Sequence, residues 1–282
     1  MAETIRCPIK INLILRVFSK RTDGYHEIYS LFWQKKGIER LTIQQKYDEI
    51  IGDSLNITGM KIEGENLVTK ALAAVRKRWD APPLDMTLEK FFPAGSGIGA
   101  GSGNAAALIK WLASRGAPLS AEETAKLGAD VAFLASGSVM AEARGIGEKM
   151  THFAPPFDFR WLLVFPKWSS GTGDAYAKLD AVRERRADRT EPEPGEDMAR
   201  IDALARGGTA GLLPNDFYEV SAAEHAEYGE AERIAEASGA RGWGLCGSGS
   251  AFFGLYAGAQ EAEAAARAFG ATDWALKTYI VE

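Results

Sequence analysis

Residues 93–104 read PAGSGIGAGSGN and run directly into an alanine-rich segment. Glycines set among small side chains allow several backbone N–H groups to turn toward one ligand. A helix that follows adds unpaired N–H groups and the positive end of its dipole, so an anion such as a nucleotide phosphate fits there. For an isolated glycine-rich run, a flexible loop or tight helix–strand packing is about as common an explanation.

The same segment differs from two common nucleotide-binding motifs. No Lys follows the last glycines, as a P-loop requires. The glycines also do not follow the G-x-G-x-x-G spacing of a dinucleotide-binding fold. The glycine spacing therefore excludes both motifs.

The composition is that of an ordinary globular protein. Of 282 residues, 46% are hydrophobic and 25% are charged, which predicts one large or two medium-sized domains. The net charge is −5 and the Lys and Arg residues are scattered, so we expect no nucleic-acid partner. Cys7 and Cys246 lack the spacing of a metal site or a disulfide framework. We find no signal sequence and no apolar run long enough to cross a membrane, which predicts a soluble cytoplasmic protein.

Hydrophobic periodicity predicts strands and helices that intermix along the chain. The first strand should have one buried face and carry Lys10 and Asn12 on the side opposite Ile11. We expect a boundary between two domains near residues 153–159 and a mobile surface loop at 183–196. We expect strands at 9–17, 28–33, 41–45, 84–88, 161–165 and 275–281, and a strand pair within 242–256. We expect helices at 66–79, 102–114, 121–127, 174–182, 198–206, 215–237 and 260–269.

The glycine-rich segment resembles the second motif of the GHMP kinase superfamily, whose members hold ATP phosphates there. The stretches KINL (10–13), KRTDGYHEI (20–28) and SLF (30–32) are similar to the signature of the diphosphocytidyl-methylerythritol kinases in particular. LGADV (127–131) and GSGS (247–250) agree in order and spacing, so the resemblance spans nearly the whole chain. It implies an α+β two-domain GHMP kinase fold. The N-terminal domain (1–155) would be ribosomal-S5-like and the C-terminal domain (156–282) ferredoxin-like, with the active site in the cleft between them.

The resemblance also implies a reaction, the ATP-dependent phosphorylation of the 2-hydroxyl of cytidine diphosphate methylerythritol, with Mg²⁺ as the expected metal. Phosphoryl transfer to an alcohol needs a base at the hydroxyl and positive charge near the transferred group. The family places its catalytic base at Asp130, with Lys10 beside it. The matching cofactor-binding positions are Asn66, Leu67, Pro93, Gly95, Gly97, Gly99, Gly101, Ser102, Gly103 and Asn104. The matching substrate-binding positions are Asn12, Tyr25, His26, Tyr176, Gly247 and Ser248.

Simpler roles compete at several of these positions. Asn66 also fits a plain helix cap, Ser248 a hairpin bend, and Tyr25 and His26 packing beside the turn at Asp23-Gly24. The family's Gly, Ser and Ser are replaced here by Ala100, Gly103 and Cys246, and its N-D-L-E run by NDFYE at 215–219. The first two replacements motivate a second hypothesis, a nucleotide-binding protein without catalysis. A third is a GHMP kinase that acts on homoserine or a mevalonate derivative, against which Tyr176 and the D-G-Y-H run argue.

Overall fold

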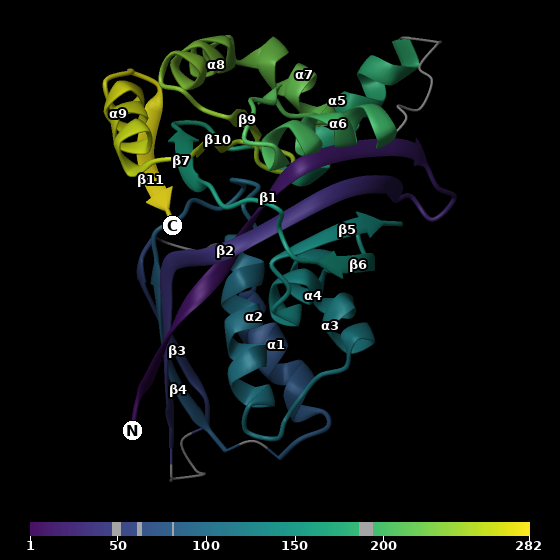
Figure 1. Ribbon diagram of the computed structural model, residues 1–282. Coiled ribbons are helices and arrows are strands. Elements are labelled where there is room, and N and C mark those ends of the chain that lie inside the picture. The colour runs from purple at the N-terminus through teal and green to yellow at the C-terminus, as the bar shows by residue number, and fades with distance from the viewer. Residues whose placement is uncertain (47–51, 61–63, 81, 186–193) are drawn as a thin grey trace. The chain divides into compact units, whose positions relative to one another are not determined.

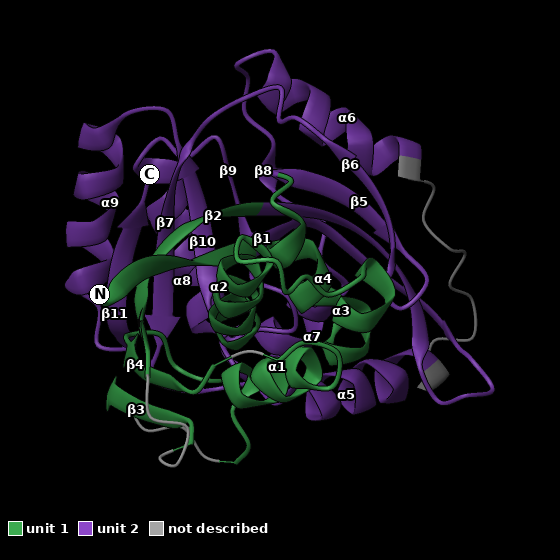
Figure 2. Cartoon of the chain, turned by 90° about the horizontal axis from the view of Figure 1, so that it is seen from below, with its two compact units in different colours: residues 1–10, 34–94, 99–138 green, residues 11–33, 95–98, 139–282 purple. Residues whose placement is uncertain are grey.

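A computed structural model describes residues 1–46, 52–60, 64–80, 82–185 and 194–282 (Figure 1). The chain divides into two compact units, each made of segments that are separate in the sequence (Figure 2). Unit 1 comprises residues 1–10, 34–94 and 99–138, and unit 2 comprises 11–33, 95–98 and 139–282. Two long strands, β1 (Glu3–Lys20) and β2 (His26–Gln45), contribute residues to both units.

Unit 1 packs helices against a mixed sheet. Strand β4 (Leu84–Lys90) pairs antiparallel with the C-terminal part of β2, from Arg40 opposite Glu89 to Gln45 opposite Leu84, and parallel with β3 (Ser54–Gly59). The helices of the unit are α1 (Leu67–Arg76), α2 (Ala100–Ala113), α3 (Ala121–Leu127) and α4 (Ala129–Ser136). Apolar side chains of the strands share one core with α1 and α2.

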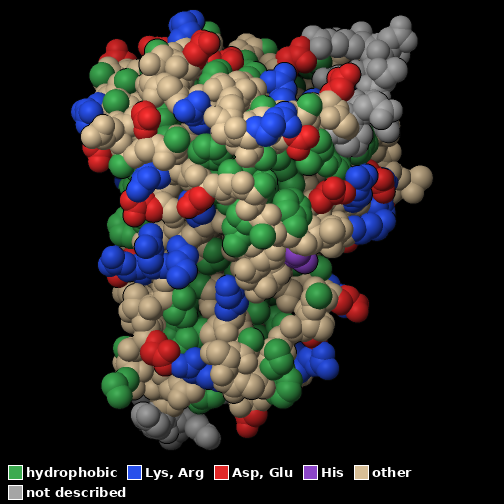
Figure 3. Space-filling model, in the orientation of Figure 1, with side chains coloured by type: hydrophobic (Ala, Val, Ile, Leu, Met, Phe, Trp, Pro, Cys, Tyr) green, Lys and Arg blue, Asp and Glu red, His purple; other side chains and the backbone are tan. Residues whose placement is uncertain are grey.

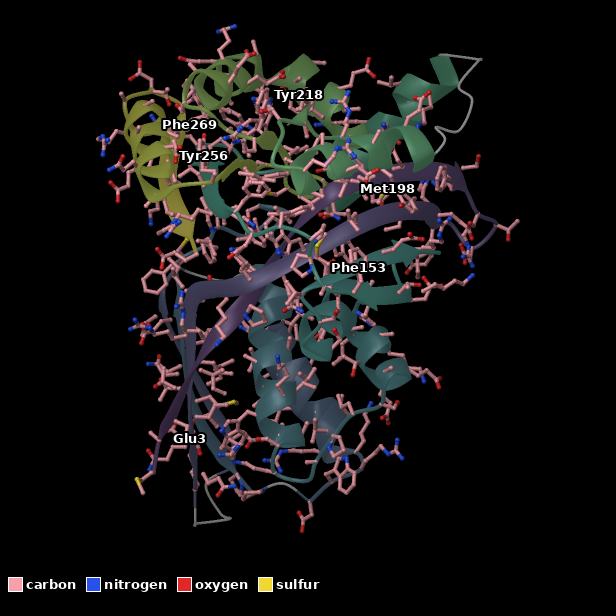
Figure 4. The ribbon with its side chains drawn as sticks, in the orientation of Figure 1. Glu3, Phe153, Met198, Tyr218, Tyr256 and Phe269 are labelled. Atoms are coloured by element: carbon pink, nitrogen blue, oxygen red, sulfur yellow. The ribbon has the colours of Figure 1, made fainter. Side chains whose placement is uncertain are left out.

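Unit 2 is built on a second sheet in the order β11-β7-β10-β9-β8, antiparallel except for the β8–β9 pair. Helices α5, α7, α8 and α9 contribute to the core on one face of this sheet, where Tyr256 and Phe269 lie (Figure 4). The strands are β7 (Arg160–Pro166), β8 (Gly211–Leu212), β9 (Gly242–Leu245), β10 (Phe252–Tyr256) and β11 (Ala275–Val281). The helices are α5 (Thr172–Arg185), α6 (Pro194–Ala205), α7 (Asp216–Glu224), α8 (Glu227–Ala237) and α9 (Ala259–Gly270). Strands β5 (Met140–Arg144) and β6 (Lys149–Phe153) extend the N-terminal part of β2.

Local sequence explains where these elements begin and what they bury. The α1 residues Val68, Ala71, Leu72 and Val75 recur at helical spacing and are all buried, as a helix with one apolar face requires. Helix α3 begins in a capping box, in which Ser120 and Glu123 exchange side chain-to-backbone hydrogen bonds. The Ser120 N–H and the Arg78 guanidinium lower the pKa of Glu123 to about 2.

The structure confirms the α+β class and most predicted elements, with corrections. Every residue from 7 to 15 is buried, so β1 is buried on both faces and the prediction of one buried face is wrong. Residues 41–45 belong to β2 and not to a separate strand, and 215–237 form two helices because the chain bends at 225–226. Of the predicted loop at 183–196, the first residues continue α5 and the last begin α6, whereas 186–193 lie outside the described residues. The domain boundary after residue 155 stays a prediction.

The surface carries charges of both signs. On the face shown in Figure 3, Lys and Arg side chains are interspersed with Asp and Glu side chains. Within the described part of the chain, no helix is both long and apolar enough to cross a membrane.

Candidate active site

Lys10 and Asp130 form an ion pair in unit 1. The Lys10 Nζ atom lies 3.4 Å from Asp130 Oδ2. The Lys10 side chain, on β1, is almost fully buried, whereas a third of the Asp130 side chain is exposed. Asp130 is the second residue of α4 and lies close to the positive end of the helix dipole. The pair thus joins a buried cation to a carboxylate that a ligand can reach.

The glycine-rich loop reaches this pair at Gly99. A Cβ atom on Gly99 would lie 3.3 Å from Lys10 Cε and 3.4 Å from Asp130 Oδ2. Gly99 directly precedes α2 and has a φ of +66°, which residues with side chains rarely adopt. The N-terminus of α2 and the Lys10–Asp130 pair are therefore neighbours.

Two more glycines of the loop lie inside α2, on either side of the half-buried Ser102. A Cβ on Gly101 would meet Leu67 Cδ1 at 3.8 Å, an ordinary contact. A Cβ on Gly103 would lie only 1.7 Å from the backbone oxygen of Pro8. Gly103 therefore allows α2 to pass directly against β1, and a serine hydroxyl has no room at this position.

The middle of the loop, residues 95–98, belongs to unit 2 and packs on the turn between β9 and β10. The Gly95 carbonyl accepts a hydrogen bond of 3.0 Å from the Ser250 N–H. A Cβ on Gly97 would lie 1.7 Å from the Cys246 backbone oxygen, so only glycine fits there. The two glycine-rich stretches that the sequence singled out are thus in contact.

The polar substrate-binding candidates of unit 2 are buried and hydrogen-bonded. Gly247 has a φ of +54° and begins the turn, and the buried Ser248 donates from its hydroxyl to Thr172 Oγ1 at 3.2 Å. Asn12 donates from Nδ2 to the Ser30 hydroxyl at 2.8 Å. These contacts hold each side chain in one orientation.

The aromatic candidates lie in unit 2 in different environments. Tyr25, beside the turn, is 61% exposed, whereas His26 is buried. The Tyr176 ring stacks on the His26 ring, with centroids 5.1 Å apart and planes at 26°. The Nδ1 atom of His26 lies 2.9 Å from the Phe18 carbonyl oxygen, which can only accept, so Nδ1 carries the hydrogen. The Nε2 atom lies 3.3 Å from Asp180 Oδ1, without hydrogen-bond geometry.

The remaining nucleotide-binding candidates lie in unit 1. Asn66 caps α1, because its Oδ1 accepts from the Val68 N–H at 2.8 Å, so the cap role considered from the sequence is confirmed. Asn104 is 1% exposed, and its side chain is bonded to Glu39 and Lys90 inside the unit. Sequence interpretation did not single out Glu39 or Lys90. No signal in the sequence marks them, because Glu39 lies close to Lys36 and Arg40 and Lys90 directly follows Glu89, as in strands with an exposed charged face.

The arrangement in unit 1 suits phosphoryl transfer, since a carboxylate, a cation and the N-terminus of α2 adjoin one another. No group of three His, Cys, Asp or Glu side chains among the described residues could hold a metal ion. Mg²⁺ bound together with a nucleotide takes many of its ligands from substrate phosphates and water. Ser102 and Asp130 are partly exposed side chains next to the loop that could add a ligand.

Comparisons with known proteins place the chain among small-molecule kinases. The GHMP kinases N terminal domain family matches residues 66–141, and the GHMP kinases C terminal family matches residues 196–274. The chain is 34% identical to the 4-diphosphocytidyl-2-C-methyl-D-erythritol kinase of Nitratidesulfovibrio vulgaris (strain Hildenborough), over 94% of this chain and 93% of the relative. It is 34% identical to the kinase of that name from Porphyromonas gingivalis, over 88% of this chain and 89% of the relative.

Solved structures give the same result for the fold. A crystal structure of 4-(cytidine 5'-diphospho)-2C-methyl-D-erythritol kinase superposes with a TM-score of 0.78 at 32% identity, over the whole of this chain and 98% of the other. Homoserine kinase from Cytophaga hutchinsonii superposes with a TM-score of 0.58 at 15% identity, over 99% of this chain and 96% of the other. At that identity the second match shows a shared fold and nothing about the substrate.

Proposed function

Because the chain belongs to the 4-diphosphocytidyl-2-C-methyl-D-erythritol kinase family of GHMP kinases, we propose that it phosphorylates the 2-hydroxyl of 4-diphosphocytidyl-2-C-methyl-D-erythritol. It is an ATP-dependent small-molecule kinase. The reaction would serve the synthesis of isoprenoid precursors by the non-mevalonate route. The reaction would take place in the cytoplasm, where buried cysteines such as Cys7 and Cys246 stay reduced.

The observation that supports this most directly is the Lys10–Asp130 pair next to Gly99. In the proposed reaction, Asp130 accepts the proton of the substrate hydroxyl while that oxygen bonds to the γ-phosphorus and the bond to the bridging oxygen of ADP breaks. Lys10 offers positive charge at 3.4 Å from the Asp130 carboxylate. The loop N–H groups and the N-terminus of α2 hold the phosphates, and Mg²⁺ would neutralise their charge.

The cytidine end of the substrate would be bound by aromatic residues of unit 2. Tyr25 is largely exposed to solvent, and the partly buried Tyr176 stacks on His26. Stacking on such rings contributes roughly 1–3 kcal/mol per base but does not distinguish one base from another. Hydrogen bonds from the segment at His26 would select cytosine, because an unpaired polar edge costs roughly 1–3 kcal/mol.

Turnover with three acceptors tests the assignment. We expect ADP release with the diphosphocytidyl substrate and none with homoserine or mevalonate. Asp130→Asn should lower kcat by about 10²–10⁴ and leave the affinity for a non-hydrolysable ATP analogue nearly unchanged, since Asp130 acts on the hydroxyl. Asp202→Asn, at an exposed site on α6, is the control and should match the wild type. Wild-type activity in Asp130→Asn, or a preference for homoserine or mevalonate, would contradict the proposal.

A further inference from the structure

The carboxylate of Glu39 is buried in unit 1 and accepts four hydrogen bonds. Its Oε1 accepts from the backbone N–H groups of Phe91 at 3.1 Å and Phe92 at 3.0 Å. Its Oε2 accepts from Lys90 Nζ and from Asn104 Nδ2, both at 2.8 Å. The Glu39 side chain is 0% exposed and that of Lys90 is 7% exposed, so water cannot substitute for these partners.

The four donors stand at the two ends of the glycine-rich loop. Phe91 and Phe92 directly precede Pro93, the first residue of the loop, and follow β4. Asn104, the last residue of the loop, lies in the second turn of α2. One carboxylate thus joins the strand that leads into the loop to the helix that leads out of it. Asn104 Oδ1 also accepts from Lys90 Nζ at 3.1 Å, which closes the network.

We propose that Glu39 is a positioning residue that fixes the distance between the two ends of the phosphate-binding loop, and so sets its affinity for ATP. This inference rests on the proposed function, in which the loop holds the ATP phosphates. The loop adds few side chains of its own to define its shape, because five of its twelve residues are glycine. Its ends therefore have to be held from outside, and Glu39 holds both with charge-assisted hydrogen bonds.

A buried ion pair that serves folding alone is the competing explanation, and the two differ in which ligand is affected. Loss of a purely structural pair lowers the stability of unit 1 without selecting between ligands. Loss of a loop clamp weakens the nucleotide that the loop holds and spares the cytidine ligand, whose candidate residues Tyr25, His26 and Tyr176 lie in unit 2.

The test is Glu39→Gln together with the exchange variant Glu39→Gln/Asn104→Asp. Glu39→Gln keeps the shape and the acceptor for Phe91 and Phe92, but turns an NH₂ group toward the donors Lys90 and Asn104. The exchange variant restores the net charge and places the carboxylate on the α2 side, at position 104. Both Lys90 and the new amide at position 39 can then donate to that carboxylate. Asp216→Asn is the matched control, because Asp216 is an equally buried carboxylate in unit 2 that accepts from Arg16, Arg183 and the Val17 N–H.

Isothermal titration with a non-hydrolysable ATP analogue and with CDP gives the decisive readout. We expect Glu39→Gln to weaken the ATP analogue by about tenfold or more, which is about 1.4 kcal/mol, with CDP affinity unchanged. The exchange variant should recover most of that loss, and Asp216→Asn should lower the Tm without a selective loss of the ATP analogue. Unchanged ATP affinity in Glu39→Gln, equal losses for both ligands, or no recovery in the exchange variant would overturn the inference.

Measurements on the wild-type protein cover two further cases: failure of the proposed function itself, and failure of Glu39→Gln to fold. If the wild type binds neither nucleotide, the proposed function itself fails, whereas the loop clamp fails only if the wild type binds and Glu39→Gln binds equally well. If Glu39→Gln does not fold, native-state hydrogen exchange of the wild type replaces it. The Phe91 and Phe92 amides should then exchange as slowly as those in the middle of α2, and fast exchange would overturn the clamp.

Discussion

Replacing Gly103 by Ala tests the close approach of α2 to β1. The added Cβ would lie 1.7 Å from the Pro8 backbone oxygen and 2.9 Å from its carbonyl carbon. A carbon–oxygen contact needs about 3.3 Å, so helix and strand would have to separate by about 1.6 Å. Both partners are backbone atoms, and no side-chain rotation can relieve the contact.

The expected cost follows from two opposing effects. Ala in place of Gly inside a helix stabilises it by about 1 kcal/mol. Forcing an extra carbon into a packed interior costs about 1–3 kcal/mol and sometimes more, and a rigid backbone contact belongs at the upper end. We therefore expect a net loss of about 2 kcal/mol or more, which lowers the Tm by about 4 °C or more. Because Lys10 lies two residues beyond Pro8 on β1, kcat should fall as well.

Gly101→Ala, two residues earlier in the same helix, is the matched control for stability. Its Cβ would meet only Leu67 Cδ1, at 3.8 Å, which is an ordinary contact. No steric cost therefore offsets the gain of up to about 1 kcal/mol from the higher helix propensity of Ala. Urea unfolding of wild type, Gly103→Ala and Gly101→Ala measures both changes. Effects of opposite sign are expected. A Gly103→Ala protein as stable as the wild type would refute the packing argument.

Three other predictions concern the proposed site. Lys10→Arg should keep less than about a tenth of kcat in steady-state assays, because a planar guanidinium cannot replace a compact ammonium beside Asp130; near-normal kcat would make Lys10 a source of diffuse charge only. Tyr25→Ala and Tyr176→Ala should each weaken CDP by roughly 1–3 kcal/mol in calorimetric titration and leave ATP unchanged; equal losses for both nucleotides would make the rings structural. Asn215→Ala should lower the free energy of unfolding by about 2 kcal/mol. The substitution removes the cap of α7 and the donor to the Leu245 and Gly247 carbonyls. No change in urea unfolding would contradict this.

The proximity of Lys10 and Asp130 could be predicted from the sequence, because both lie in motifs of the family that the chain resembles. Lys10 and Asp130 are 120 positions apart, and the family resemblance pairs them as the structure does. Capping residues such as Ser120 and Asn66 were also predictable, since a cap depends on neighbours in the chain.

Features that depend on distant partners could not be predicted in this way. Whether β1 is buried on one face or on both depends on the elements that pack against it. The alternation of apolar and polar residues within one strand does not identify those elements. From the sequence, Glu39 would be predicted to lie on the solvent-exposed face of a strand. Only the structure shows that Lys90 and Asn104 donate hydrogen bonds to it. The sequence likewise predicted one helix where the structure has α7 and α8, because no glycine or proline lies at the bend at His225.

The two changes in the loop that suggested a protein without catalysis both lie at buried positions. Ala100 is 7% exposed, so its methyl group is enclosed by protein, and Gly103 lies against the Pro8 carbonyl, where no hydroxyl fits. Neither change removes Gly99, Lys10 or Asp130. Burying a lysine ammonium is costly unless a charge compensates it, and here the compensating carboxylate is itself partly exposed beside the loop. A protein that only bound nucleotide would gain nothing from keeping that costly pair, which supports the proposal that Asp130 is a base that the substrate can reach.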